Sequence, residues 1–285
     1  MIRINALGTV QVADWISFGR AGLTIRSAIA MPAETFELWP ARPLAGGQCP
    51  SVELLTLMAS HCGGRHMGTL SAEPKSRRVA IGQKRLEGDV VLPRHAKGLV
   101  IFAHGSGSSR FSPRNTHVAR QLHVQALGTL LLDLLTEREA DDRQNVFNIP
   151  LLAARMVEAV RFARTDAELS ALRIGLFGAS TGAAAALVAA AQLPQDVTAV
   201  VSRGGRPDLA GAALMEVRAP TLLIVGGADY GVIELNREAF AVLTCEKKLE
   251  IVPGATHLFE EPGTLDKVVD LTAQWFNAHF EAADT

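Results

Sequence analysis

The segment Ile174-Gly-Leu-Phe-Gly-Ala-Ser-Thr-Gly182, followed by an alanine-rich run over 183–191, decides the fold. An apolar, strand-like stretch meets Gly178-Ala-Ser-Thr-Gly182, and a helix-forming stretch follows at once. A serine between small residues at a sharp strand-to-helix turn has an exposed hydroxyl, and the amides of the next helix face any oxyanion formed there. The pattern predicts Ser180 as a nucleophile, although taken alone it also fits an ordinary helix cap.

Strand-like and helical patterns alternate outward from this segment. Strands are predicted at residues 86–92, 98–103, 128–135, 172–177, 197–201, 221–225 and 249–252. Helices are predicted from Ser112-Pro113 onward and at 149–164, 209–215, 232–243 and 265–280, with a charged loop over 137–143. This alternation predicts an α/β fold with a mostly parallel, doubly wound sheet flanked by helices. The stretch 202–220 is too short for a cap domain.

Three predicted strand ends each deliver one residue type that nucleophilic catalysis requires. Ser180, Asp229 and His257 follow the strands in that order. A neutral serine needs an imidazole to take its proton, and the imidazole needs a carboxylate to hold its tautomer. The order predicts a Ser-His-Asp triad. Individually, Asp229 also fits a helix cap and His257 an ordinary loop histidine.

The loop His104-Gly-Ser-Gly-Ser108 follows an early strand. In hydrolases with this turn, the loop at that place supplies one of the two backbone N–H groups of the oxyanion hole. We expect the backbone N–H groups of Ser106 and Thr181 to form that hole. Two other readings stay open: the glycines can form a phosphate-binding nest, and His104 can hold the shape of the loop.

Four arginines lie on the predicted sheet-end loops, and arginine suits carboxylate or phosphate. We expect Arg110 and Arg203 to bind substrate, with Arg203 selecting an anionic one. The alternative is that the four form surface salt bridges, for instance with Asp208 or Glu137; they are Arg110, Arg114, Arg203 and Arg206.

Residues 79–280 resemble the α/β-hydrolase superfamily, and within it the dienelactone-hydrolase-like branch, at segments 102–115, 178–182, 202–209, 223–229 and 253–259. The resemblance implies an α/β-hydrolase fold and a serine hydrolase that cleaves a carboxylester, thioester or lactone through an acyl-enzyme, with no cofactor or metal. Dienelactone hydrolase itself uses cysteine as nucleophile, so Ser180 argues against its lactone substrate. The segment after His104 is also similar to a subgroup sometimes fused to a phosphoribosyltransferase domain, whose acidic pair and phosphate loop this sequence lacks.

The regular pattern begins at Val79. We therefore expect an N-terminal extension of uncertain order over 1–78, or a small accessory module, and a catalytic domain over 79–285. Within the extension, residues 24–31 fit a strand and 52–60 a short helix.

The 285 residues are 48% hydrophobic and carry a formal net charge of −1, which gives no reason to expect nucleic acid as a partner. No stretch approaches a membrane span, and we expect no secretory signal, because the N-terminus lacks a basic start followed by an apolar segment. Three widely spaced cysteines, Cys49, Cys62 and Cys245, suggest free thiols in a cytoplasmic protein. The pattern predicts a small-molecule partner and leaves the oligomeric state open.

Two rival functions come from other classes. Gly175-x-x-Gly178-x-x-x-Gly182 loosely mimics a dinucleotide turn, as in an oxidoreductase, but such a turn normally follows the first strand. A non-catalytic binding protein on the same scaffold is the second rival.

Overall fold

The computed structural model describes residues 2–4, 9–13, 28–32 and 74–281, and the chain forms two compact units, Met1–Met67 and Gly68–Thr285. In the first unit, β1 (Ile2–Ile4), β2 (Thr9–Ala13) and β3 (Ala28–Pro32) make an antiparallel sheet in that order. The strand predicted over 24–31 overlaps β3. The helix predicted over 52–60, Cys49 and Cys62 lie outside the described residues.

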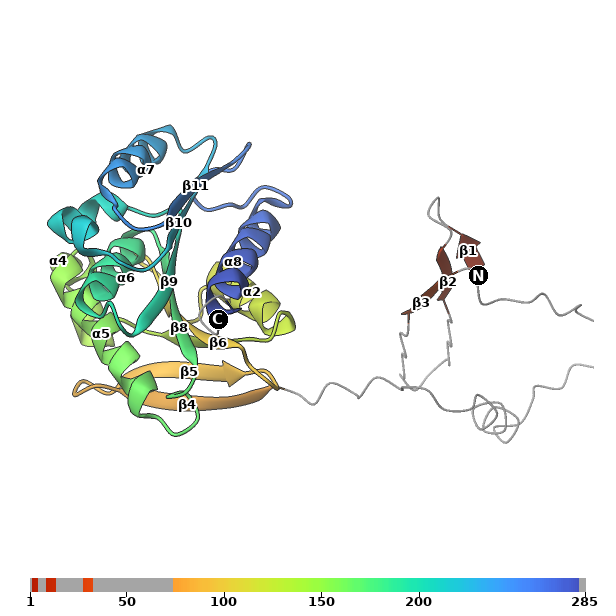
Figure 1. Ribbon diagram of the computed structural model, residues 1–285, viewed down its shortest axis with the longest axis horizontal. Coiled ribbons are helices and arrows are strands. Elements are labelled where there is room, and N and C mark those ends of the chain that lie inside the picture. The colour runs from red at the N-terminus through yellow and green to blue at the C-terminus, as the bar shows by residue number, and fades with distance from the viewer. Residues whose placement is uncertain (1, 5–8, 14–27, 33–73, 282–285) are drawn as a thin grey trace, which may run out of the picture. The chain divides into compact units, whose positions relative to one another are not determined.

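The second unit is built on an eight-stranded sheet in the order β11-β10-β9-β8-β6-β7-β5-β4 (Figure 1). The β4–β5 and β5–β7 pairs are antiparallel and the other pairs are parallel. Its strands are β4 (Lys75–Ile81), β5 (Leu86–Leu92), β6 (Gly98–Ala103), β7 (Leu127–Leu132), β8 (Arg173–Ala179), β9 (Val197–Arg203), β10 (Thr221–Gly226) and β11 (Lys247–Val252).

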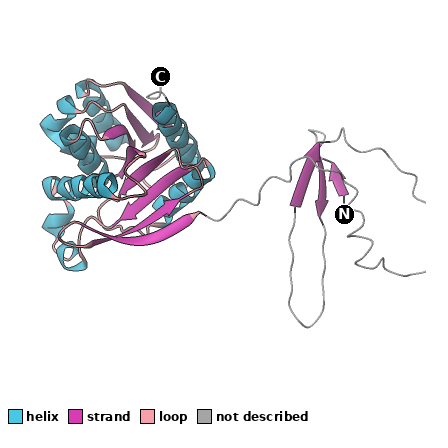
Figure 2. Cartoon of the chain, turned by 60° about the horizontal axis from the view of Figure 1, so that its bottom comes forward, coloured by secondary structure: helices cyan, strands magenta, loops and turns pink. Residues whose placement is uncertain are grey.

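Helices cover both faces of this sheet, as Figure 2 shows. One face packs on α2 (Pro113–Val124) and α8 (Thr264–Glu281). The other packs on α5 (Ile149–Thr165), α6 (Thr181–Gln192), α7 (Tyr230–Val242) and the 3-10 segment η2 (Pro207–Glu216). Because central strands such as β6 and β10 are buried along their whole length, they form near-continuous apolar runs. The predicted α/β architecture is confirmed, and only η2 fills the connection where a cap would lie.

Two details differ from the sequence prediction. The charged loop predicted over 137–143 forms two short helices, α3 (Glu137–Ala140) and α4 (Arg143–Val146). Thr136 and Glu139 form a capping box at α3, and this local signal overrides the polar composition. Strand β4 (Lys75–Ile81) is not among the predicted strands and begins before Val79, where the regular pattern starts; its first half is exposed and carries charged residues, so it lacks an apolar pattern.

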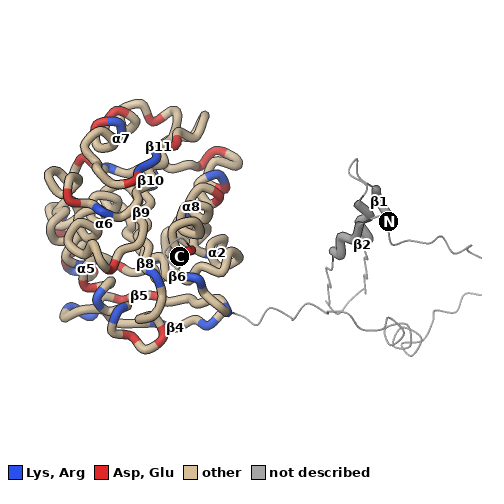
Figure 3. Tube along the Cα trace, in the orientation of Figure 1, with Lys and Arg blue, Asp and Glu red and all other residues tan. Residues whose placement is uncertain are grey.

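Charges of both signs are mixed along the helices and strands of the second unit (Figure 3). Among the described residues, none of the helices is both long and apolar enough to cross a bilayer. Within the same residues, histidine, cysteine and carboxylate side chains do not gather into a group of three that would hold a metal ion.

Candidate active site

Ser180 lies at the turn between β8 and α6, where the backbone is strained. Its φ of 52° and ψ of −124° belong to a conformation that residues other than glycine rarely adopt. The turn is so tight that only glycine fits at two positions. A Cβ at Gly178 would lie 2.4 Å from Ala183 Cα, and one at Gly182 would lie 2.3 Å from the Ala103 carbonyl oxygen. The Ser180 side chain makes no capping hydrogen bond, so its hydroxyl is not engaged as a helix cap.

His257 and Asp229 meet at the same edge of the sheet, on the loops that follow β11 and β10. His257 Nδ1 lies 2.7 Å from Asp229 Oδ2. The carboxylate accepts this hydrogen bond, which fixes the proton on Nδ1 and leaves Nε2 to accept another. Asp229 precedes α7 but makes no side-chain cap to it, so the capping alternative does not describe its side chain.

The loop that carries His257 is tied to its own far end. Glu261 accepts hydrogen bonds from Thr256 N at 3.1 Å and from Thr256 Oγ1 at 2.6 Å. The Thr256 hydroxyl and amide lower the pKa of the Glu261 carboxyl, which stays ionised at neutral pH. This clamp fixes the backbone immediately before His257.

Ser180 and His257 line one small cavity of about 220 Å³. Its walls come from the loop after β6, the start of α2, the β8–α6 turn, the end of β9 and the His257 loop. The lining residues are Gly105, Ser106, Ser108, Ser112, Arg114, Asn115, Ala179, Ser180, Arg203, Gly204, His257 and Leu258.

The two residues expected to form the oxyanion hole are joined to each other. Ser106 N donates to Thr181 Oγ1 at 3.1 Å. His104 supports the same loop: Nδ1 lies 3.0 Å from the Gly105 carbonyl, and Nε2 accepts from Leu134 N at 3.2 Å. Burial lowers the pKa of His104, so the ring is neutral at neutral pH with its proton on Nδ1. His104 therefore holds the loop's shape.

Arg203 ends β9 beside the nucleophile turn. Its side chain is buried, with 6% of the residue exposed, and burial together with Arg114 lowers its pKa to about 10, so it remains charged at neutral pH. Nη2 donates to Asn115 Oδ1 at 3.4 Å, and the guanidinium lies 5.8 Å from the centre of the Phe259 ring. Sequence reasoning missed Asn115 and Phe259, since neither follows a strand end directly.

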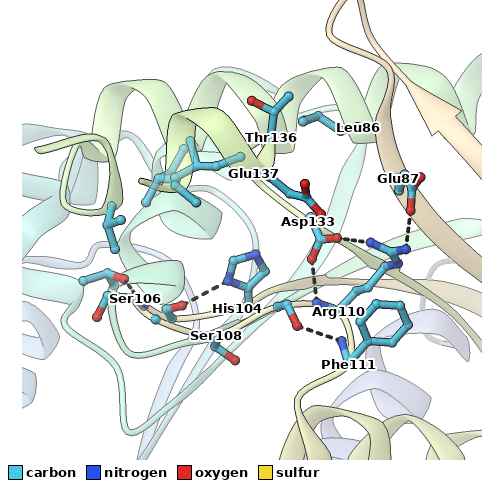
Figure 4. A pocket seen from close by; sticks show the side chains of 18 of the residues that line it. Leu86, Glu87, His104, Ser106, Ser108, Arg110, Phe111, Asp133, Thr136 and Glu137 are labelled. Atoms are coloured by element: carbon cyan, nitrogen blue, oxygen red, sulfur yellow. Dashed lines mark hydrogen bonds and ion pairs between the residues drawn. The ribbon is translucent and has the colours of Figure 1, made fainter. Parts of the chain in front are cut away.

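Arg110 lines a second, larger hollow of about 760 Å³ and not the small cavity (Figure 4). Its guanidinium pairs with Asp133, Glu87 and Asp89. Hydrogen bonding and the charge of Asp133 outweigh desolvation and raise the pKa of Arg110. The salt-bridge alternative also describes Arg206, which pairs with Asp208 at 2.7 Å, and Arg114, which pairs with Glu260 at 3.0 Å.

Residues 132–280 match the sequence model of the dienelactone hydrolase family. The chain is 51% identical to a dienelactone hydrolase from Anabaena variabilis whose crystal structure superposes with a TM-score of 0.71, covering 73% of this chain and 99% of that one. The chain belongs to the dienelactone hydrolase family. The expected α/β-hydrolase fold and family resemblance are thereby confirmed.

Two other similarities bear on the chain. It is 54% identical over 201 residues to a Mycobacterium tuberculosis protein that carries the provisional name of a phosphoribosyl transferase. This match covers 70% of the chain but 45% of that protein, so the chain spans less than half the length of these curated relatives. Est1E from Butyrivibrio proteoclasticus, at 15% identity, covers 74% of this chain and 100% of its own with a TM-score of 0.59, and shows the fold alone.

Proposed function

We propose that the chain is a serine hydrolase that cleaves a small carboxylester, thioester or lactone through an acyl-enzyme. The observation that carries the proposal is the 2.7 Å contact between His257 Nδ1 and Asp229 Oδ2, on a histidine that lines one cavity with Ser180. Family membership supports hydrolysis of an ester-like substrate. The strained turn at Ser180 supports a nucleophilic role, because such strain persists where function requires it.

The proposed reaction assigns a role to each of three side chains. Ser180 Oγ attacks the carbonyl carbon while its proton passes to His257 Nε2, and the resulting imidazolium is stabilised by Asp229. The tetrahedral intermediate collapses, the leaving group departs with the proton from Nε2, and the acyl group stays on Ser180. Water then attacks the acyl carbon and gives a proton to Nε2. The bond between the acyl carbon and Ser180 Oγ breaks as Nε2 returns that proton to Oγ, which releases the acid and regenerates Ser180.

The oxyanion would be held by the amides of Ser106 and Thr181. Ser106 N donates to the Thr181 hydroxyl in the free protein. To bind the oxyanion, the Ser106 N–H must either turn away from that hydroxyl or donate to the hydroxyl and the oxyanion together. Catalytic hydrogen bonds often tighten only in the substrate complex. Each such donor contributes about 3 kcal/mol to transition-state stabilisation.

The dinucleotide alternative loses support at Gly175. A Cβ there would lie 2.4 Å from Phe276 Cε1 of α8, so this glycine makes room for a core helix. The glycine spacing in 175–182 is accounted for by packing.

Labelling with a fluorophosphonate probe tests the proposal. Folded wild-type protein should be labelled, Ser180→Ala should not, and Ser108→Ala, which alters another serine of the same cavity, should keep the label. Absence of label on folded wild type would favour a non-catalytic binding protein. Label on Ser180→Ala would move the nucleophile elsewhere.

A further inference from the structure

The hollow of about 760 Å³ has an apolar interior (Figure 4). Leu86, Leu135 and Leu152 line it and are buried; they come from the start of β5, the loop after β7 and α5. Val146, the last residue of α4, lines it too and is partly buried. A volume of this size with an apolar lining is typical of a site for a small molecule. Four charged lining residues are instead exposed to solvent, namely Arg85, Glu87, Glu137 and Arg138.

The titratable groups enclosed in the hollow already have partners. Arg110, whose side chain is 9% exposed, pairs with Asp133, whose side chain is 20% exposed. Both ring nitrogens of His104 are engaged by the backbone. A charged ligand would lose its hydration there without gaining an unpaired partner. The interior of the hollow therefore suits a neutral, apolar group.

The hollow adjoins the nucleophile turn. It shares Gly105, Ser106 and Ser108 with the small cavity, and Thr181, the residue after the nucleophile, lines it as well. A Cβ at Gly105 would lie 2.8 Å from Ser180 Cβ and 3.6 Å from Ser180 Oγ. Because residue 105 is glycine, it has no side chain that would separate the Ser180 hydroxyl from the wall that the two cavities share.

The direction of proton transfer decides which part of an ester faces the hollow. Under the proposed mechanism the leaving oxygen must lie near His257 Nε2, and His257 lines the small cavity and not the hollow. The oxyanion must lie at the amides of Ser106 and Thr181, on the boundary of the two cavities. The remaining substituent of the reacting carbon is the acyl chain. A cavity of about 220 Å³ leaves little room for that chain beside the leaving group, whereas the hollow has the space.

We propose that the hollow is the acyl-binding pocket, and that the enzyme prefers esters of neutral, apolar acids of hexanoyl to octanoyl size. Burial of the chain against Leu86, Leu135 and Leu152 supplies the selectivity, at about two- to fourfold in kcat/KM for each methylene. The proposal rests on the proposed serine-hydrolase function, because it assigns the acyl group of the substrate of that site.

A series of 4-nitrophenyl esters with one leaving group and acyl chains of increasing length tests the pocket. From acetate to octanoate, wild-type kcat/KM should rise at least about 50-fold. Val146→Trp fills part of the hollow and should lower the octanoate-to-acetate ratio of kcat/KM at least about tenfold. Ala140→Trp, at an exposed position of the same lining, repeats the test without changing a partly buried side chain.

Val124→Trp is the matched control. Val124 is the last residue of α2, as Val146 is of α4, and it lines neither cavity. Its octanoate-to-acetate ratio should stay within about twofold of wild type. The proposal is overturned if wild-type kcat/KM does not rise with acyl length, or if Val146→Trp and Ala140→Trp, both folded, leave the ratio unchanged.

Two isomeric esters distinguish the acyl side from the alcohol side. Methyl octanoate and heptyl acetate carry the same heptyl chain, on the acyl side in the first and on the alcohol side in the second. In pH-stat assays wild type should have the higher kcat/KM for methyl octanoate, and Val146→Trp should lower the ratio of the two values. A preference for heptyl acetate that Val146→Trp removes would place the leaving alcohol in the hollow and overturn the proposal.

A binding measurement separates this inference from the proposed function. N-methyloctanamide, titrated calorimetrically into Ser180→Ala, should bind at least about tenfold more tightly than N-methylbutanamide. The added change Val146→Trp should reduce the difference. Equal binding of the two amides would contradict the acyl pocket even where Ser180 is labelled by fluorophosphonate. Absence of labelling with the length-dependent binding retained would remove the hydrolase function and keep the pocket.

Discussion

Two cavities adjoin at the loop after β6, and their arginines differ in one respect. In the hollow of about 760 Å³, Arg110 is surrounded by Asp133, Glu87 and Asp89. In the cavity of about 220 Å³, Arg203 has no carboxylate partner among the described residues. The larger cavity thus pairs its buried arginine with carboxylates, whereas the smaller one does not. Under the proposed function the smaller cavity is the one where the chemistry occurs, so cavity size alone would point to the other.

The histidines of the two cavities show the same contrast. His104 lines the hollow with both ring nitrogens engaged by the backbone, whereas His257 lines the small cavity with one nitrogen held by a carboxylate. A general base needs a free nitrogen, so His257 can transfer a proton and His104 cannot. The hydrogen-bond partners of the two histidines, and not their residue type, therefore distinguish the structural role of His104 from the catalytic role proposed for His257.

The largest expected effect is the loss of His257. His257→Ala should reduce kcat for 4-nitrophenyl acetate by about 10⁶-fold, because triad members act as a unit. The matched change His104→Gln, in the other cavity, should reduce kcat far less and mainly destabilise the fold. Comparable losses in kcat for two well-folded variants would erase the distinction between the histidines.

Asp229→Asn should have the next largest effect. The amide keeps the shape of the side chain but no longer fixes the proton on Nδ1, so we expect kcat to fall about 10⁴-fold. Steady-state kinetics with the same ester gives this value. Asp208→Asn, which changes the carboxylate paired with Arg206, is the control and should leave kcat nearly unchanged. An Asp229→Asn enzyme within tenfold of wild type would contradict the orienting role.

The sequence was sufficient for the sheet and for the strand-end residues, because buried strands and a serine turn leave strong local patterns. The apolar run before Ser180 and the glycines around it encode β8 and its turn almost completely. The sequence could not separate Arg110 from Arg203, since both follow strand ends. Their difference depends on Glu87 and Asp133 being brought together by pairing of distant strands, which is a property of the tertiary fold.

Arg110→Gln should change stability and not specificity. The variant leaves three carboxylates without their positively charged partner, and the Asp133 side chain is only 20% exposed. We therefore expect the free energy of unfolding to fall by about 2–3 kcal/mol. Urea denaturation measures this change. The ratio of kcat/KM for an anionic ester to that for a neutral ester of matched size should stay within about threefold of wild type. A collapse of that ratio would assign substrate binding to Arg110.

The smallest effect is a pH dependence of stability that originates in two partly buried histidines, of which His104 lines the larger hollow and His123 lies on α2. Burial lowers the pKa of His104 below its ordinary value of 6.5, and burial, together with Arg120, does the same for His123. Below pH 6.5 the unfolded chain therefore binds more protons than the folded one, and stability falls as the pH drops toward the lowered folded-state pKa values. The contribution is complete above pH 6.5, and each histidine changes the free energy of unfolding by at most about 1.4 kcal/mol per pH unit.

Carboxylates with lowered pKa, such as Asp166, act below this window, so the range between pH 6.5 and 5 isolates the histidines. Urea denaturation of wild type at pH 7.5, 6.5 and 5.5 should show stability falling over the last interval. In His104→Gln the slope should be shallower, because the amide oxygen can accept from Leu134 N without titrating. A slope equal to that of wild type would mean that His104 takes up its proton in the folded protein as readily as in the unfolded chain, and its two backbone contacts would then no longer distinguish it from His257.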